Sequence, residues 1–245
     1  MIRLSVNVNK VATVRNSRGG SVPSVIEAVR VCLKAGAPGI TVHPRADARH
    51  ITPRDVQEIA AELAPRRGAV EYNIEGDPRP DLVELVEQTR PDQCTLVPVR
   101  PGEVTSEAGW PPTTDRQQTT RVVDRLHRAG VRISLFVDPA AEPIRWAAEM
   151  GADRIELYTE PFARAFERGA TEGQRSFDTY ARVAELAHAL GLGINAGHDL
   201  DLDNLQLFRA LPHLDEVSIG HAIISRAIFV GLDRVVREYL QVLAG

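Results

Sequence analysis

A chain of 245 residues, 43% of them hydrophobic, can bury a full core, and a single α/β barrel commonly has about 250 residues. The net charge of −4 argues against a nucleic-acid-binding surface, which would need a basic patch. No apolar run approaches the roughly 18 residues of a membrane span, and no signal peptide precedes the first strand-like run, so we expect a soluble, cytoplasmic protein.

Eight short runs of β-forming residues alternate with segments of helical periodicity along the chain. In chain order the runs are residues 4–9, 39–43, 69–74, 93–98, 132–137, 154–159, 192–197 and 216–221. Four helical segments end in a glycine just ahead of the next run: Gly36, Gly130, Gly151 and Gly191. Eight β–α units in one chain of this length predict a single-domain (β/α)8 TIM barrel of the α/β class over residues 1–245. A doubly wound sheet is the alternative, but no GxGxxG pattern follows the first run.

Polar side chains share one face in each of the first three runs. They are Ser5, Asn7 and Asn9, then Thr41 and His43, then Glu71, Asn73 and Glu75. Side chains alternate between the two faces of a strand, and the outer face of a parallel barrel meets helices. We therefore expect these residues to point inward, where branched apolar side chains normally fill the barrel. A lone inward polar residue would be a satisfied core group, whereas three strands together indicate a polar ligand.

The second run ends in a histidine and leads into a polar loop. Residues 39–43 end at His43, and Arg45, Arg49 and His50 follow in the loop. Thr52 and Pro53 then have the residue types of a helix N-cap and first helical position. A strand, a polar cluster and a helix in this order are typical of an α/β active site, where chemistry lies at the strand ends.

Two longer inserts follow the fourth and sixth runs. Residues 99–114 are rich in proline and contain Trp110, and residues 160–175 form the second insert. In a barrel, both would lie on the active-site face. Loops of this length often act as lids, although inert surface loops are the alternative.

Several segments, in order over most of the chain, match one known family. They are Asn7 with 11–19, residues 39–45 with Arg49, His50 and Ile51, Glu71, residues 96–98 with 103–105, residues 134–136, residues 195–198, and residues 219–224. With these segments the chain resembles the pyridoxine 5′-phosphate synthase family of vitamin B6 biosynthesis. The resemblance implies a TIM barrel, a homo-oligomer that is typically an octamer, and no metal or organic cofactor. Cys32 and Cys94 also lack the spacing of a metal site, and we expect buried free thiols.

The activity that the resemblance implies is a transferase-type synthesis. Two phosphorylated small molecules, 1-deoxy-D-xylulose 5-phosphate and 3-amino-2-oxopropyl phosphate, condense and close to pyridoxine 5′-phosphate, releasing phosphate and water. Each step moves protons, so positioned acids and bases are needed. The resemblance assigns acid–base roles to His43, Glu71 and His198, which we expect to converge on the mouth of the barrel.

The resemblance also assigns substrate-binding residues. They are Asn7, Asn9, Lys10, Arg18, Arg45, His50, Thr105, Asp199, Gly220 and His221. Arginine suits phosphate contacts, although a solvated surface charge is the alternative for any single arginine. The Gly220-His221 turn can offer backbone N–H groups to a phosphate.

Three substrate-binding positions depart from the family pattern. The chain has Asn9 and Lys10 where the family usually has Asp-His, a pair that helps to hold the deoxyxylulose phosphate, and Asp199 replaces a glycine. We expect Asn9 and Lys10 to keep this substrate by a different chemical route.

Two other functions remain open from the sequence. One is another cofactor-free phosphosugar aldolase or epimerase, since TIM barrels host many such enzymes. The other is a catalytically silent paralogue that binds a B6 precursor as a sensor or carrier.

Overall fold

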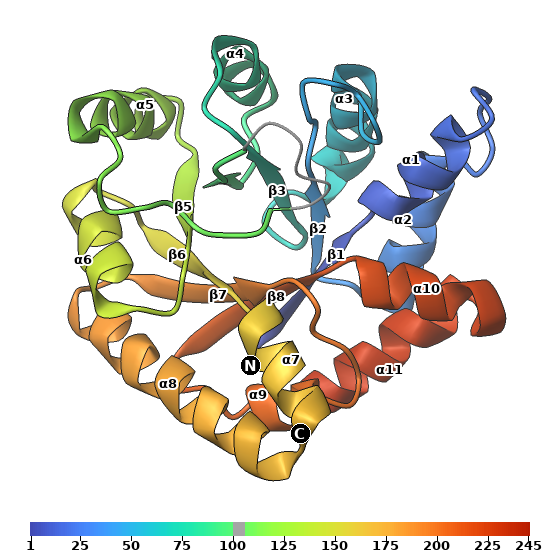
Figure 1. The fold of residues 1–245 in the computed structure, drawn as a ribbon. Helices are drawn as coiled ribbons and strands as arrows, with labels where there is room; N and C mark the ends of the chain where they lie inside the picture. Colours follow the sequence, from blue (N-terminus) through green and yellow to red (C-terminus); the bar gives the residue numbers. More distant parts are fainter. Residues whose placement is uncertain (100–105) are drawn as a thin grey trace.

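The computed structural model describes residues 1–99 and 106–245, and its eight strands close into a parallel barrel ringed by helices (Figure 1). The strands are β1 (Arg3–Asn7), β2 (Gly39–Val42), β3 (Glu71–Gly76), β4 (Gln93–Leu96), β5 (Arg132–Val137), β6 (Arg154–Tyr158), β7 (Gly193–Gly197) and β8 (Leu214–Ile219). Each strand pairs with the next, and β8 pairs with β1. The predicted TIM barrel is confirmed, and all strand C-terminal ends meet at one opening, called the mouth below.

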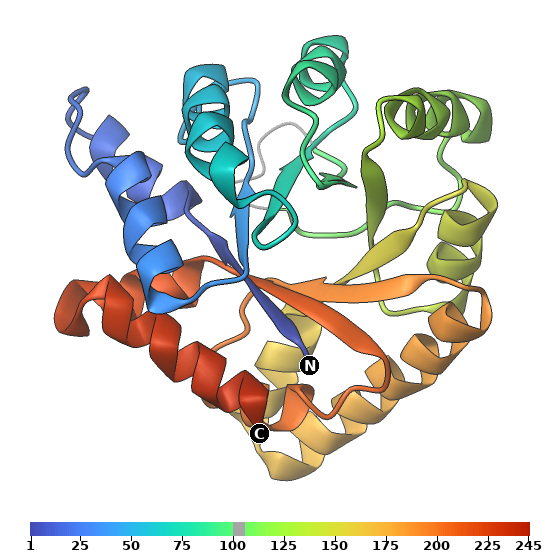
Figure 2. The same ribbon diagram turned by 180° about the vertical axis from the view of Figure 1, so that it is seen from behind.

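The helices lie outside the barrel, as the view from behind also shows (Figure 2). They are α1 (Asn9–Asn16), α2 (Val25–Ala35), α3 (Pro53–Leu63), α4 (Pro80–Thr89), α5 (Arg116–Arg128), α6 (Ala141–Glu149), α7 (Glu160–Arg168), α8 (Ala170–Ala189), α9 (Leu205–Phe208), α10 (His221–Val230) and α11 (Leu232–Ala244), with a short 3-10 turn η1 (Ala64–Arg66). Within the described residues, none of them is long and apolar enough to cross a membrane.

Local sequence explains where these helices begin and end. Thr52 caps α3, and its side chain and that of Asp55 form reciprocal hydrogen bonds, with Pro53 at the first helical position as expected. Gly36 ends α2 in the left-handed region, at φ 100°. One expectation is wrong: residues 160–175 are not a loop but form α7 and the start of α8. Pro161 lies in the first turn of α7, and Phe162 is buried.

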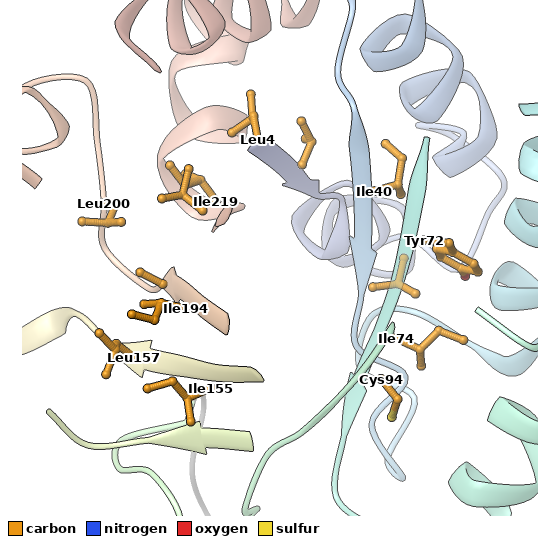
Figure 3. Close-up of a cluster of buried hydrophobic side chains, with 14 of the residues drawn as sticks. Leu4, Ile40, Tyr72, Ile74, Cys94, Ile155, Leu157, Ile194, Leu200 and Ile219 are labelled. Atoms are coloured by element: carbon orange, nitrogen blue, oxygen red, sulfur yellow. The ribbon is translucent and has the colours of Figure 1, made fainter. Parts of the chain in front are cut away.

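The hydrophobic core lies between the outer face of the barrel and the helices (Figure 3). Outward side chains such as Leu4, Ile40, Ile74 and Ile155 are fully buried there. Cys94 also lies in this layer as a buried free thiol, as does Cys32. Burying one aliphatic side chain of this size contributes about 1.5–3 kcal/mol, so this layer stabilises the ring of strands.

The inner face of the barrel is polar, as the strand alternation predicts. Ser5 and Thr41 share a hydrogen bond of 2.6 Å between their hydroxyl oxygens. The amide of Asn73 donates to the Thr41 hydroxyl over 3.4 Å, and the Thr95 hydroxyl donates to Asn73 Oδ1 over 3.1 Å. These hydrogen bonds pair buried polar groups of β1 to β4 with one another. Ser134 Oγ and both carboxyl oxygens of Glu216 are buried without a partner among the described residues.

Candidate active site

His43 follows β2 at the mouth and faces Glu75, the carboxylate near the end of β3. Only 5% of the His43 surface is exposed, and its Nδ1 lies 3.8 Å from Glu75 Oε2. Its Nε2 is buried and has no hydrogen-bond partner among residues 1–99 and 106–245. Burial lowers the pKa of His43 well below its usual value, and the charges of Arg45 and other nearby groups lower it further. The imidazole is therefore neutral at pH 7, and Nε2 is free to exchange a proton with a ligand.

Glu75 is a carboxyl group held between three strands. Its Oε2 accepts a hydrogen bond of 3.4 Å from Asn7 Nδ2, and its Oε1 accepts one of 3.5 Å from the Ser218 hydroxyl. Burial raises the pKa of Glu75 to about 7, against the lowering effects of Ser218 and Arg45. A carboxyl group with this pKa is both an available acid and an available base at neutral pH.

The expected position of Glu71 at the mouth is wrong. Glu71 is the first residue of β3, so at about 3.3 Å per residue it lies roughly 13 Å below Glu75 along the strand. Its carboxylate accepts a hydrogen bond from Arg132 and lies 3.9 Å from Arg3 Nη2, at the opposite end of the barrel. Glu71 and Glu75 share one face, and alternation alone does not say which end each occupies. The signal that the sequence did contain is that Glu75, like His43, closes its strand.

His198 follows β7 and brings a second neutral imidazole to the mouth. Its ring centroid lies 5.0 Å from that of Phe136 and 5.6 Å from that of Tyr158. Burial, followed by the charges of Arg45 and Lys10, lowers the pKa of His198 to about 4. The backbone of His198 is in the left-handed region, at φ 76°, and Thr159 donates a hydrogen bond to its carbonyl.

Asp199 comes next and is also left-handed, at φ 54°. Burial raises the pKa of its carboxyl group, and its carbonyl accepts a hydrogen bond from Asn204 Nδ2. The family's glycine at this position would adopt such a φ without strain, whereas Asp199 is held there by its neighbours.

Glu156 is an acid of the site that the sequence analysis missed. It points inward from β6, is 2% exposed, and its Oε2 is buried without a partner in the described part of the chain. Burial and the charges of Glu75 and Glu216 raise its pKa well above the usual value, which favours its neutral form. A Cβ at Gly197 would lie 2.6 Å from Glu156 Oε1, so the glycine makes room for this carboxyl. Strand parity with Arg154 and Tyr158 could have found it.

Arg45 and His50 are the cationic and donor groups beside these acids and bases. Arg45 is 7% exposed, and its charge lowers the pKa values of His43, His50 and His198. His50 Nδ1 accepts the Ile51 N–H over 2.9 Å, which leaves the proton on Nε2. Burial and then Arg45 lower the pKa of His50 to about 4. A fixed guanidinium and a neutral N–H donor together suit a phosphate.

The segment after β1 is hydrogen-bonded to the main chain of His43. Asn9 Oδ1 accepts the His43 N–H over 2.9 Å, and Asn7 Oδ1 accepts the Asn9 N–H over 3.0 Å. Lys10 is the second residue of α1 and is half-buried. Its positive charge lowers the pKa values of both His50 and His198. The side-chain oxygen of Asn9 therefore binds the main chain of His43.

Gly220 and His221 form the turn between β8 and α10. Gly220 is the N-cap residue of the ten-residue helix α10, which begins at His221. A Cβ at Gly220 would lie 3.0 Å from both Cβ and the carbonyl oxygen of Asn7, so only glycine lets these segments approach. The N-terminus of α10 thus lies at the mouth, next to Asn7, where its N–H groups can receive an anion.

One expected site residue, Arg18, is not brought to this cluster, and another cannot be placed. Arg18 is exposed in the turn that follows α1, at the end of that helix away from Asn9. Thr105 lies outside the described residues.

Known proteins match the sequence over nearly the whole chain. Residues 4–245 match a family model described as pyridoxal phosphate biosynthesis protein PdxJ. A curated pyridoxine 5′-phosphate synthase of Porphyromonas gingivalis is 48% identical over 245 residues, covering 100% of both chains. One of Flavobacterium johnsoniae is 48% identical over 242 residues, covering 98% of this chain and 99% of the other.

Solved structures share the fold at low sequence identity. The 3-hexulose-6-phosphate synthase of Salmonella typhimurium has a TM-score of 0.67 at 14% identity and covers 99% of each chain. The thiamine phosphate pyrophosphorylase of Pyrococcus furiosus has a TM-score of 0.64 at 15% identity, covering 99% of this chain and 96% of the other.

Proposed function

This chain belongs to the family of the pyridoxal phosphate biosynthesis protein PdxJ, and we propose that it is a pyridoxine 5′-phosphate synthase acting on 1-deoxy-D-xylulose 5-phosphate and 3-amino-2-oxopropyl phosphate. The observation that carries the proposal is the meeting of His43 and Glu75, 3.8 Å apart, beside Arg45 at the mouth. The chain acts as one catalytic domain over residues 1–245.

The acid–base groups of the site have different protonation states at neutral pH, and this gives them different roles. Condensation, loss of water and ring closure each move protons, and His43 and His198 are neutral donors or acceptors at pH 7. Glu75, with its pKa near 7, alternates between acid and base, and it takes the role that the resemblance assigned to Glu71. Because these groups lie on β2, β3 and β7, they can reach different atoms of one bound substrate.

Two phosphorylated substrates need two anion sites. Arg45, His50 and Lys10 form one set of donors, and the Gly220-His221 turn at the start of α10 forms the other. Asn7, Asn9 and Asp199 are the other polar residues that we assign to substrate binding. Arg18 and Thr105 stay candidates for substrate binding from the resemblance alone.

The activity is tested by mixing the purified protein with both substrates. We expect phosphate release together with the absorbance of pyridoxine 5′-phosphate. A phosphosugar aldolase or epimerase would instead convert one phosphosugar without the amino ketone. A silent paralogue would bind a substrate and release no phosphate.

Replacing Lys10 by alanine is expected to raise the Michaelis constant for 1-deoxy-D-xylulose 5-phosphate by about tenfold. A hydrogen bond to a charged group contributes about 1.5–3 kcal/mol, and Lys10 supplies an ammonium where the family has histidine. The constant for the amino ketone should change much less, and Lys34→Ala, on the C-terminal turn of α2, is the control. Equal changes for both substrates would show that Lys10 does not hold the sugar phosphate.

Inorganic phosphate at millimolar concentration is expected to compete with 3-amino-2-oxopropyl phosphate. The N–H groups of the first turn of α10 are free to receive an anion, and phosphate resembles the substrate's charged end. Initial rates measured against chloride at equal ionic strength separate competition from screening. Purely non-competitive inhibition would contradict this assignment of the turn.

The assembly and compartment are part of the same proposal. Ile228 and Phe229 on α10 are 73% and 86% exposed, and such exposed apolar side chains support contact between copies in a homo-oligomer. Two buried free thiols agree with a reducing compartment such as the cytoplasm. Sedimentation of the purified protein measures the assembly directly.

A further inference from the structure

Arg79 lies just before α4, and its guanidinium donates three hydrogen bonds to three different residues. Its Nη2 donates to the Pro44 carbonyl over 2.6 Å, its Nη1 to Asp77 Oδ1 over 2.6 Å, and its Nε to Asp81 Oδ2 over 3.0 Å. The side chain is only 16% exposed. The two aspartates therefore hold the planar guanidinium in one orientation, with Nη2 directed at the Pro44 carbonyl.

The Pro44 carbonyl belongs to the segment that carries the site. Pro44 has no N–H of its own, and it separates His43 from Arg45. The segment is bound from one side by Asn9, which accepts the His43 N–H, and from the other side by Arg79. The first contact comes from the first residue of α1. The second comes from the β3–α4 connection, 35 residues away from Pro44 in sequence.

We propose that Arg79 is a positioning residue of the active site, whose hydrogen bond to the Pro44 carbonyl fixes the orientation of His43 and Arg45. This inference rests on the proposed function. The hydrogen bonds of Arg79 go to Asp77, Asp81 and the Pro44 carbonyl, so it acts on the site through the segment 43–45. A displacement of about 1 Å at a reacting group can lower a rate by up to a hundredfold, so such fixation matters for catalysis.

The charge of Arg79 adds an electrostatic effect on the same histidine. His43 is faced by Arg45 and His50 from its own loop, by Glu75 from β3, by His198 from the end of β7, and by Arg79 from before α4. Burial lowers the pKa of His43 most, and Arg79 is the last of the four groups whose charge lowers it further. Removing the charge should therefore move the pKa of His43 upward, toward its ordinary value.

The test compares Arg79→Met, which removes the charge and all three donors, with Arg79→Lys, which keeps the charge but not the planar fork. For Arg79→Met we expect kcat to fall about tenfold with little change in either KM. For Arg79→Lys we expect a similar fall in kcat, because an ammonium cannot make the three hydrogen bonds of the planar fork. Arg125→Met, which removes an exposed arginine paired with Glu87, is the control and should leave kcat and both KM values at those of the wild type.

Two measurements test the same point without turnover. In Arg79→Met, the His43 amide should exchange its hydrogen faster, and an NMR titration should give a higher pKa for the His43 imidazole than in the unmodified protein. These two results would stand even if the unmodified protein made no pyridoxine 5′-phosphate, so the two proposals fail separately. Wild-type kcat, amide exchange and titration in both variants would overturn the positioning role of Arg79. If Arg79→Met does not fold, the kcat and amide exchange of Arg79→Lys decide alone.

Discussion

Glu75→Gln is expected to lower turnover by about a hundredfold or more, the usual scale for the loss of a positioned acid or base. Glutamine keeps the size of the side chain and can still bond to Asn7 and Ser218, so the barrel should fold normally. The amide cannot take up or release a proton in the range where Glu75, with its pKa of about 7, does so. The change therefore removes chemistry and leaves packing in place.

The pH dependence gives a second readout for Glu75. When a carboxylate acts as the base, activity rises as the pH increases through its pKa, so the unmodified protein should show a limb near pH 7. This limb should be absent from the residual activity of Glu75→Gln.

The matched control is Glu71→Gln on the same face of β3. Glu71 pairs with Arg132 and Arg3 at the far end of the barrel, so this variant should lose thermal stability and keep turnover within a few-fold. A large loss of turnover in Glu71→Gln, with Glu75→Gln near wild type, would reverse the assignment.

Replacing His198 by asparagine is expected to have an effect of similar size. The imidazole is the neutral donor and acceptor on the β7 side of the mouth, packed beside Phe136 and Tyr158. Asparagine is chosen because the backbone is left-handed at φ 76°, a conformation that asparagine tolerates and alanine does not. We therefore expect a fall in kcat of about a hundredfold without a large change in thermal stability.

His213→Asn provides the matched control for this change. His213 is also left-handed, at φ 59°, but it stacks on His188 at a centroid distance of 3.7 Å, outside the mouth. The variant His213→Asn should therefore have the turnover of the unmodified protein at saturating substrate. Near-wild-type kcat in His198→Asn would exclude His198 from the proton transfers.

Local features of the sequence were enough to predict the barrel. The eight β-rich runs overlap all eight strands, because the outward residues form an apolar face that the helices must cover. The cap at Thr52 and the glycine at Gly36 act within a few residues of themselves, so they could be predicted as well. The insert at 160–175 differs: it is helical, and its buried residue Phe162 packs against Tyr180 of α8, a contact distant in sequence that local patterns do not predict.

The sequence by itself determined the α/β barrel, the inward face of its polar residues and the strand-end position of His43. A period of two places Glu71 and Glu75 on the same face of β3, and their order along the chain puts Glu75 nearer the C-terminal end of the strand. Only the closed barrel, with its register between neighbouring strands, decided that Glu75 meets His43 while Glu71 meets Arg132. The hydrogen bond from Arg79 to the Pro44 carbonyl could not be predicted from the sequence either. Contacts between the loops that follow two strands form only when the strands lie side by side, as β2 and β3 do.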